Sequence, residues 1–395
     1  MKFARAVLVP FLVLPAVAGA VEGDTFRPVV SYGYSYDSNL LRQQDDAPAR
    51  AYYSFFGFDL PHSDTYQQLG LGFDLDWKAG RQRVLAKARV SKTRFNHYNL
   101  LNYSGQDANL EWQWQLGNYW SGRLGAGRVK SLGSFRDTDT TGGLVSNTRT
   151  SENLFLDANY RIHPRWQAGV KLNSNTYTYS AAAQRNSNSE TDGWTLGVYF
   201  LGSTLQRVGM EVRENTIRFP NRIVTPTLDN DYTDRSLNLV GNWVASGKSS
   251  LNVRIGRVER KNKNISTRDY SGLNWRLDGN WSISGKSLIG ASLYREVRST
   301  EYTTSNHSLV SGGTLSYIWQ VMPKTRFQTS FSQEDFDYDG IARRDKVKTA
   351  TIAAIYEPWD GGEISAGVQR ETRDSNQFLY SYKSSSLFLN ANLKF

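Results

Sequence analysis

The chain has 395 residues, no cysteine, and 47 lysine and arginine residues against 37 aspartate and glutamate residues. The absence of cysteine excludes disulfides and thiolate metal sites. A mean hydropathy of -0.54 and the lack of a long apolar run after the N-terminus argue against membrane-spanning helices. The positive excess favours anionic partners. Because the basic residues stand singly and form no stripe, we expect no nucleic-acid partner.

The first 20 residues have the features of a cleaved signal peptide. Lys2 and Arg5 precede an apolar run from Ala6 to Leu14, and small residues follow at 18–20. Loss of Lys2 and Arg5 reduces the 47 basic residues to 45, against 37 acidic ones. Composition does not shift after residue 24, so we expect a signal peptide over 1–20 and one domain over 21–395.

Short polar turns recur along the chain at intervals of 37 to 47 residues. Each interval holds two runs of alternating apolar and polar residues separated by a longer polar loop, as in a hairpin of a transmembrane β-barrel. Eight such turns separate nine hairpins, which predicts an all-β, antiparallel outer-membrane barrel of 18 strands with both termini in the periplasm. The turns are centred on Gly80, Gly117, Pro164, Gly202, Gly247, Gly285, Pro323 and Gly361.

The first hairpin sets the pattern. We expect strands over 27–36 and 65–77, joined by an outer loop over 37–63. Within that loop, Tyr52 to Leu60 resembles a strand, but counting it would place the chain ends on opposite sides of the membrane. We therefore expect this stretch to fold over or into the pore.

Strict alternation assigns the two faces of the second, fourth and twelfth expected strands. On the fourth, Leu110 and Trp112 share one face, and Asn109 and Glu111 share the other. A soluble β-sandwich would show the same alternation, so tryptophan placement decides the solvent. Eight of the 11 tryptophans lie near the short turns, as in the aromatic girdle of a barrel. They are Trp77, Trp114, Trp120, Trp166, Trp243, Trp281, Trp319 and Trp359.

The chain ends on a strand-like segment, Leu387 to Phe395. A terminal phenylalanine resembles the recognition signal of the outer-membrane insertion machinery. We therefore expect that machinery, outer-membrane lipid and lipopolysaccharide as partners.

The third expected strand carries the richest row of charge. Arg81, Arg83, Lys87 and Arg89 alternate with apolar residues. Because a cation on the lipid face costs about 2–4 kcal/mol near the midplane, the row is expected to line the lumen. Four further lumen cations are expected on later strands, namely Arg207, Arg213, Arg254 and Arg276.

Two interpretations of this row stay open. It could attract an anionic polysaccharide through the lumen. Alternatively, acidic residues on neighbouring strands could neutralise it and leave a polar wall without selectivity. Those residues are Asp74, Asp76, Asp107 and Glu111.

Enzymatic chemistry finds little support. His62, His97, His163 and His307 all fall in expected loops or turns, without a matching serine. The triplet around Asp337 lacks the later glutamate of a calcium loop. We expect no catalytic residue, no metal and no cofactor.

One segment carries a family resemblance. Tyr36, Asp37, Ser38, Asn39 and Leu40, followed by Leu41 and Arg42, resemble a signature of the EpsL-type outer-membrane proteins of exopolysaccharide biosynthesis. The segments 80–83, 112–114 and 160–166 are similar to that family's pattern as well. The resemblance implies a bacterial outer-membrane barrel that takes part in polysaccharide export.

Three functions follow from these observations. An 18-stranded barrel leaves an aqueous lumen, so the leading hypothesis is a channel that passes a nascent polysaccharide. The alternatives are a general diffusion porin and a non-conducting structural or adhesive scaffold in the outer membrane. Conductance separates the scaffold from the two channels.

Overall fold

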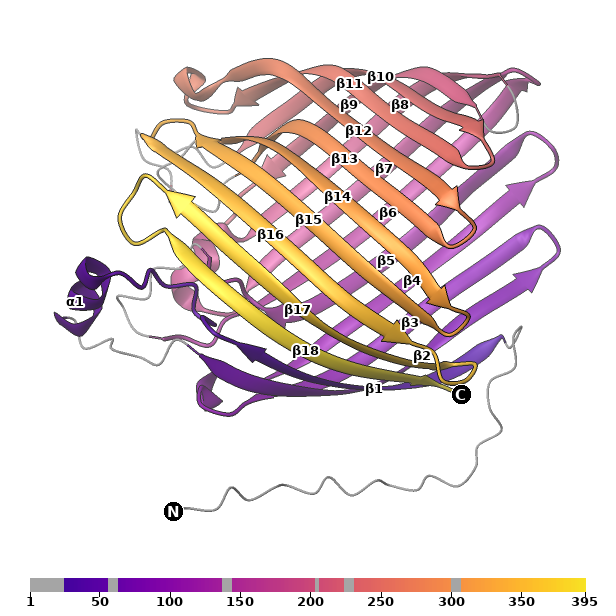
Figure 1. The fold of residues 1–395 in the computed structure, drawn as a ribbon. Coiled ribbons are helices and arrows are strands. Elements are labelled where there is room, and N and C mark those ends of the chain that lie inside the picture. Colours follow the sequence, from indigo (N-terminus) through magenta and orange to yellow (C-terminus); the bar gives the residue numbers. More distant parts are fainter. Residues whose placement is uncertain (1–24, 56–62, 137–143, 203–205, 224–230, 300–306) are drawn as a thin grey trace.

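The computed structural model describes residues 25–55, 63–136, 144–202, 206–223, 231–299 and 307–395. The expected signal peptide over 1–20 lies outside these residues. One antiparallel sheet of 18 strands runs around the molecule, and β1 pairs with both β2 and β18, which closes the barrel (Figure 1). The predicted fold class and strand number are therefore confirmed.

The strands are β1 Phe26–Asp37, β2 Asp64–Ala79, β3 Gln82–Phe95, β4 Tyr103–Leu116, β5 Trp120–Leu132, β6 Thr148–His163, β7 Trp166–Tyr179, β8 Ser189–Leu201, β9 Arg207–Arg218, β10 Tyr232–Ser246, β11 Ser249–Asn262, β12 Tyr270–Ser284, β13 Ser287–Arg298, β14 Ser308–Met322, β15 Thr325–Tyr338, β16 Arg343–Tyr356, β17 Gly362–Ser375 and β18 Tyr382–Lys394. The helical elements are α1 Ala47–Phe55 and three short 3-10 turns at Asn99–Leu101, Ala182–Ser187 and Ser266–Arg268. In the described part of the chain, no helix combines the length and the apolarity that crossing a membrane requires.

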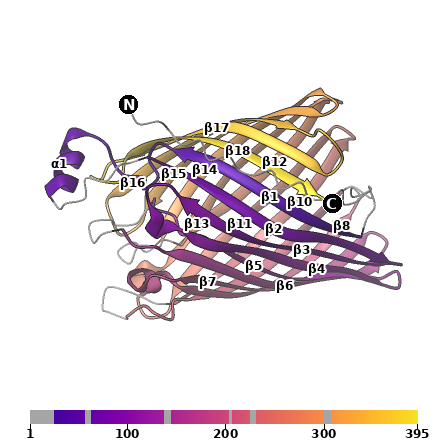
Figure 2. The same ribbon diagram turned by 90° about the horizontal axis from the view of Figure 1, so that it is seen from below.

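The two ends of the barrel differ in their connections. All eight predicted short turns lie at one end, where β18 also finishes, and the longer connections lie at the other (Figures 1 and 2). Residues 203–205 of the β8–β9 connection lie outside the described residues. Gly80, Gly117 and Gly361 have φ values of 59°, 58° and 82°, which favour glycine because it lacks a Cβ. We call these ends the turn end and the loop end.

Alternate residues on each strand form two faces. On β4, Leu110, Trp112 and Leu116 are exposed, whereas Asp107 on the opposite face pairs with Lys87 of β3. The predicted apolar faces of β2 and β12 are likewise exposed, through Leu69, Leu71, Trp77, Leu273 and Trp281. The alternation is confirmed, and the exposed apolar band is the surface that lipid covers.

The predicted tryptophans cluster at the turn end. Seven of the eight lie on strands close to the short turns, and Trp359 lies in the β16–β17 turn itself. Trp120 contacts Tyr160 with ring centroids 4.7 Å apart, and Trp166 contacts Phe200 at 5.4 Å. This belt is the girdle that the sequence predicted.

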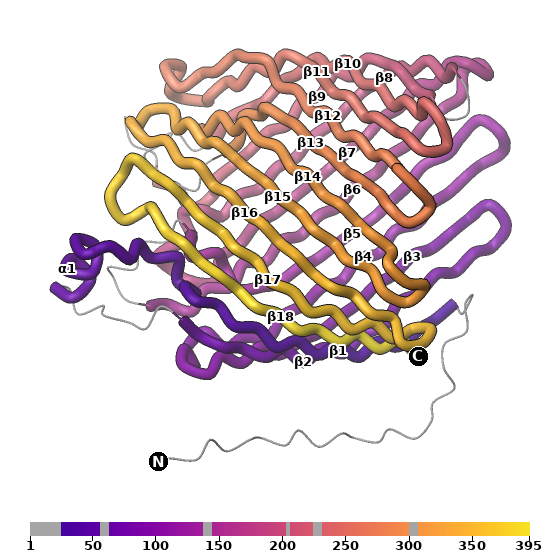
Figure 3. The backbone as a smooth tube through the Cα atoms, in the orientation of Figure 1, coloured from indigo at the N-terminus to yellow at the C-terminus, as the bar shows by residue number. Residues whose placement is uncertain are grey.

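The first long connection contains α1, where the sequence predicted only a loop. Asp46 caps the helix through its side-chain oxygen, which accepts from the Ala49 amide at 2.9 Å. Tyr52 on this helix contacts Phe378 of the β17–β18 connection, with centroids 5.9 Å apart. The tube view shows α1 beyond the strand ends, beside the β17–β18 hairpin (Figure 3). Residues 56–60, the rest of the stretch expected to fold over or into the pore, lie outside the described residues, as does His62.

Candidate functional site

Glu371 on β17 identifies the lumen face. Its carboxylate accepts from Arg42 Nε at 3.3 Å and from Arg136 Nε at 3.2 Å. Arg136 lies in the β5–β6 connection, and five strands separate β5 from β17 around the barrel. Arg136 therefore reaches Glu371 across the mouth, so Glu371 points inward. The lumen faces of the other strands follow from the register and the period of two.

The segment that carried the family resemblance forms a corner between β1 and β18 at the loop end. The Asp37 carboxylate accepts from the hydroxyls of Ser384 at 2.7 Å and Ser386 at 3.0 Å. Ser38 donates its amide to the Ser385 carbonyl at 2.9 Å, and its hydroxyl accepts from the Ser385 amide at 2.8 Å. These bonds join the first and last strands where the barrel closes.

The rest of this segment turns the chain inward. The Asn39 side chain donates to the carbonyls of Gln43 at 2.7 Å and Lys383 at 3.1 Å. Arg42 takes a φ of 56°, and its guanidinium donates to Asp37. Tyr36 stands one residue before the corner, on β1. All the contacts of this segment hold the chain together, so it is explained as a structural corner.

An apolar cluster covers part of the mouth beside this corner. Leu41 is buried with Phe95, Tyr98 and Leu101, and Leu40 packs against them. Burial, with Asp64 nearby, raises the pKa of Tyr98 to about 12, so its hydroxyl stays protonated at neutral pH. The loops at the β1–β6 side thus form a small core of their own.

The basic row on β3 is paired with acidic side chains. Arg83 donates to both oxygens of Asp76, at 2.7 and 2.6 Å. Arg89 contacts Asp74, and Lys87 contacts Asp107. Asp74 also lies 3.4 Å from Lys394 of β18. Each cation of the row on β3 thus has a carboxylate beside it, as the neutralised-wall interpretation expected.

Two further side chains named in that prediction lie elsewhere. Arg81 lies in the β2–β3 turn and not on β3, because the strand begins only at Gln82. Its guanidinium donates to the Gly117 carbonyl at 2.7 Å and to Asn118 at 3.1 Å. Glu111 faces Arg123 of β5 at 4.0 Å. Arg81 therefore links two neighbouring turns and does not extend the row.

Glu211 organises the opposite wall, on β9. It is 3% exposed and accepts from Lys171 of β7 at 3.0 Å and from the Tyr199 hydroxyl of β8 at 2.8 Å. Arg254 of β11 reaches its other oxygen at 3.2 Å. One carboxylate thus serves two cations, which leaves this group with a net positive charge. Nothing in the sequence pattern ranks Glu211 above other inward acids.

Arg276 on β12 is fully paired. It lies 3.1 Å from Asp278 on its own strand and 3.5 Å from Glu296 of β13. Its guanidinium also stacks on the ring of Tyr294, 4.9 Å from the centroid. Of the four cations predicted beyond β3, Arg276 is the one whose charge is most fully compensated.

Arg207 and Arg213 on β9 have no carboxylate partner within 4 Å among the described residues. Arg207 lies over the ring of Tyr199, 3.4 Å from its centroid, and two of its nitrogens have no hydrogen-bond partner in that part of the chain. With the Asn215 amide assigned so that its oxygen faces Arg213, the guanidinium donates to that oxygen at 3.0 and 3.2 Å. A stacked ring and a neutral amide orient these guanidinium groups without cancelling their charge.

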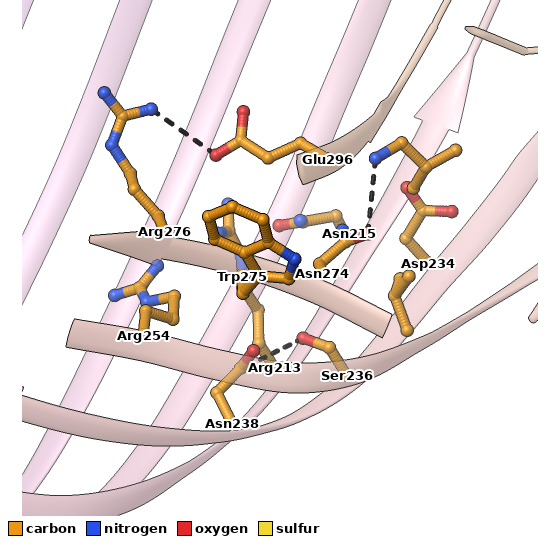
Figure 4. A pocket seen from close by; sticks show the side chains of 12 residues that line it. Arg213, Asn215, Asp234, Ser236, Asn238, Arg254, Asn274, Trp275, Arg276 and Glu296 are labelled. Carbon is orange, nitrogen blue, oxygen red and sulfur yellow. Dashed lines mark hydrogen bonds and ion pairs between the residues drawn. The ribbon is translucent and has the colours of Figure 1, made fainter. Parts of the chain in front are cut away.

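Two recesses in the lumen wall contain these cations. The first has a volume of about 300 Å³ and brings Arg213, Arg254 and Arg276 together with the amides of Asn238 and Asn274 (Figure 4). Asp234 also borders it, but this carboxylate is held by Arg260 at 2.7 Å.

A second recess, of about 630 Å³, lies at the turn end. Arg83 and Arg123 line it together with Arg207. Arg207 therefore lines a recess shared with cations of β3 and β5, whereas Arg213 lines the recess formed by β9 to β13.

Two of the histidines and two aspartates of the acidic triplet take structural positions. His163 accepts from the Arg165 amide at 3.3 Å in a short turn, and burial lowers the pKa of His307 at the start of β14. Asp335 and Asp337 pair with Lys346 and Arg344 of the next strand. Within the described ranges, no three acidic or histidine side chains are grouped to hold a metal ion.

Comparison with known proteins gives a fold and no sequence family. No protein-family model matches the chain, and no curated protein matches it. OccK2 (OpdF) of Pseudomonas aeruginosa has a TM-score of 0.52 at 8% identity, covering 94% of this chain and 98% of its own. OccAB4 of Acinetobacter baumannii gives 0.51 at 9%, covering 94% and 99%. OpdK of P. aeruginosa, solved with vanillate, gives 0.50 at 10%, covering 94% and 99%.

The chain has the fold of an outer-membrane porin. This fold, with its apolar outer band, places the chain in the bacterial outer membrane in contact with lipid. The expectation that the chain is not an enzyme is in line with this fold, which the solved porins named above share.

The identification with EpsL-type proteins is wrong. No family model supports it, and the solved structures named above that share this fold are Occ and Opd proteins. The physical reason lies in the segment 36–42, whose sequence likeness is explained by its place at the closing corner between β1 and β18.

Proposed function

We propose that this porin is a diffusion channel that prefers small anions. The observation that carries the proposal is the pair of lumen cations on β9, Arg207 and Arg213, that no carboxylate within 4 Å neutralises among the described residues. The other lumen cations named above have an acidic neighbour. This arrangement supports the diffusion-porin hypothesis better than polysaccharide export, which depended on the rejected resemblance.

Charge balance explains why the unpaired cations matter. An ion pair in contact has little field beyond its immediate surroundings, whereas an uncompensated guanidinium attracts anions over about one Debye length, about 10 Å at 0.1 M salt. On the wall from β7 to β11, Glu211 carries one negative charge against Lys171 and Arg254. With Arg207 and Arg213, this wall has a surplus of positive charge.

Tight binding of an anion would slow its permeation, and the neutral groups that line this wall do not favour tight binding. The neutral amides of Asn238 and Asn274 and the hydroxyl of Ser236 line the recess beside Arg213. Such groups replace water around a passing solute with hydrogen bonds and add no charge. The wall is therefore suited to raise the local anion concentration and to release the solute again.

Ion selectivity of the purified protein in a planar bilayer tests the proposal. With a tenfold KCl gradient at low salt, the wild type should conduct and its reversal potential should indicate anion preference. The double variant Arg207→Gln and Arg213→Gln should lose most of that preference. Absence of conductance would instead favour the scaffold hypothesis, and unchanged selectivity would remove the role of the two arginines.

A matched control uses the paired wall. Asp76→Asn combined with Arg83→Gln also changes two lumen residues but removes one positive and one negative charge together. Its selectivity should equal that of the wild type. A shift as large as that of the β9 variant would mean that any change in the lumen alters selectivity.

Export and insertion complete the proposal. Cleavage after residue 20 would release the chain that begins just before β1. Phe395, whose amide donates to the Pro28 carbonyl at 2.9 Å, would be read by the insertion machinery before the barrel closes. N-terminal sequencing of the membrane-extracted protein, and insertion of a chain that lacks Phe395, test these two steps.

A further inference from the structure

The outward face of β16 to β18 carries three cations near the loop end. Lys348 of β16 pairs in register with Thr372 of β17, and Thr372 pairs with Lys383 of β18. Arg370 lies two residues from Thr372 on the same face of β17. The three cations thus surround one threonine, on the face opposite the lumen.

Neighbouring contacts establish that these side chains point outward. Glu371, between Arg370 and Thr372, points into the lumen, where it binds Arg136. The hydroxyls of Ser384 and Ser386 bond to Asp37 on the lumen side, so the residues between and beside them in β18 face outward. Arg370 donates to the Ser385 hydroxyl at 3.0 Å, which keeps its guanidinium on the outer surface.

The three cations have no carboxylate partner within 4 Å in the described part of the chain. Most outward cations at this end are paired on neighbouring strands, namely Arg128 with Glu152, Arg218 with Asp192, Arg235 with Glu214, Arg344 with Asp337 and Lys346 with Asp335. Arg344 and Lys346, the outward cations that precede Lys348 on β16, are thus paired, whereas the triad of Lys348, Arg370 and Lys383 is not, although Asp374 lies two residues from Thr372 on the same face of β17.

The triad borders the apolar band. Val368 precedes Arg370 on the outward face of β17, Leu387 lies on that of β18, and Ile352 lies on that of β16, all about half exposed. On β17 the apolar residue and the cation are consecutive outward residues, whereas on β16 and β18 one outward residue, Ala350 or Ser385, lies between them. The triad is thus at the depth of lipid headgroups in the loop-end leaflet.

We propose that the triad binds the phosphate group of an anionic lipid in that leaflet. Adjacent strands are about 4.8 Å apart, so the Cα atoms of Lys348 and Lys383 are separated by about 10 Å, with Arg370 about 6–7 Å further along. Flexible lysine side chains on both sides of an arginine fork can converge on one phosphate at this spacing. The Thr372 hydroxyl between them supplies a further donor.

The adjacent apolar band selects a lipid over a free anion. Acyl chains attached to the phosphate would cover Val368 and Leu387, a contact that inorganic phosphate lacks. The site lies on the opposite surface of the wall from the proposed channel, so it is independent of ion selectivity. The ligand class is a phosphorylated glycolipid of the lipopolysaccharide type.

Lipid binding by the full-length barrel in detergent tests the site. Native mass spectrometry with bisphosphorylated lipid A should show bound lipid on the wild type. The variant Lys348→Gln, Arg370→Gln and Lys383→Gln should bind it about a hundredfold more weakly, since each surface cation contributes a factor of about five. The heat-dependent gel shift of the folded barrel verifies that the variant folds.

The control removes three cations at the other end. Arg165, Lys248 and Lys286 lie in short turns at the turn end and are exposed. Their joint replacement by glutamine should leave lipid binding unchanged.

Four outcomes would each overturn the proposal. Three of them are equal binding by the triad variant and the wild type, equal loss in the control, and displacement of the lipid by millimolar inorganic phosphate. Undiminished binding of dephosphorylated lipid A to the wild type would overturn it as well, because acyl contacts alone would then explain the binding.

Discussion

The lumen walls formed by β3 and by β9 carry similar numbers of cations in different surroundings. On β3, Arg83 and Arg89 each contact an aspartate of β2. On β9, Arg207 stacks on a tyrosine ring and Arg213 bonds to a neutral amide. β3 has more basic residues in its sequence than β9, yet its charges are more fully neutralised.

The difference shows that the field of a pore depends on the partners of its charges more than on their number. A carboxylate in contact with a cation cancels its field at the distances over which ions are attracted. The wall of β9 keeps its charge because Glu211, its buried acid, is shared between Lys171 and Arg254.

The largest expected effect concerns the orientation of both walls in the membrane. Ala342→Cys lies in the β15–β16 connection at the loop end, and Ser246→Cys lies beside the turn that follows β10. An impermeant maleimide on whole cells should label the first position and not the second. If Ser246→Cys alone is labelled, the barrel has the opposite orientation in the membrane, and the proposed lipid site lies in the other leaflet.

The next effect tests whether the wall of β9 to β12 faces water. Leu273→Arg on β12 places a charge on the lipid face and should destabilise the folded barrel, by less than the cost of about 2–4 kcal/mol at a midplane position, because residue 273 lies near the loop end of the strand. Asn274→Arg, one residue away, should fold normally because it faces the lumen. The fraction of heat-shifted barrel on a gel measures both. An equal loss of folded barrel in the two variants would mean that the lipid and lumen faces are wrongly assigned.

Removing the shared carboxylate of Glu211 should increase the difference in net charge between the two walls. Glu211→Gln keeps the size of the side chain and its hydrogen bond to Tyr199. It removes the negative charge that compensates Lys171 and Arg254. We expect anion preference to rise several-fold at 0.1 M KCl and to fade at 1 M, where the Debye length is about 3 Å. Asp107→Asn, which frees only the half-exposed Lys87, should have a smaller effect. A decrease of anion preference in Glu211→Gln would contradict the charge surplus of this wall.

The smallest effect is on stability. Asp74→Asn leaves Arg89 and Lys394 without their carboxylate and should cost about 1–2 kcal/mol. Arg213→Gln has no ion pair to lose and should change stability by less than about 0.5 kcal/mol. Urea unfolding in lipid vesicles measures both free energies. The opposite order would show that Arg213 is more strongly compensated than its contacts indicate.

The sequence was sufficient for the barrel and insufficient for its charge balance. A period of two and regular turns determine strand number and faces, because each strand must turn apolar residues to lipid. Pairing depends on which inward side chains converge across a curved wall, as Lys171 and Arg254 do on Glu211 from strands two apart on either side. Local sequence contains no information on that convergence.

Two local errors have physical reasons. Arg81 continues the alternation of β3 in sequence, but the tight turn at Gly80 takes it out of the strand. The aromatic run after Tyr52 has strand-forming composition, yet the Asp46 cap and the proline at 48 start a helix before it. The capping signal was present in the sequence and outweighs the β propensity that follows.

The bonds at the mouth also constrain the order of assembly. Asp37 can form its hydrogen bond only when Ser386, 349 residues later, is in place, and Arg136 can bond only when Glu371, 235 residues later, is in place. Until the final hairpin is in place, the first and third loops lack these hydrogen-bond partners and cannot adopt their folded positions. Ordering of the mouth and closure of the seam between β1 and β18 are therefore one cooperative event, so a barrel that stalls before its last hairpin has an unstructured entrance as well as an open edge.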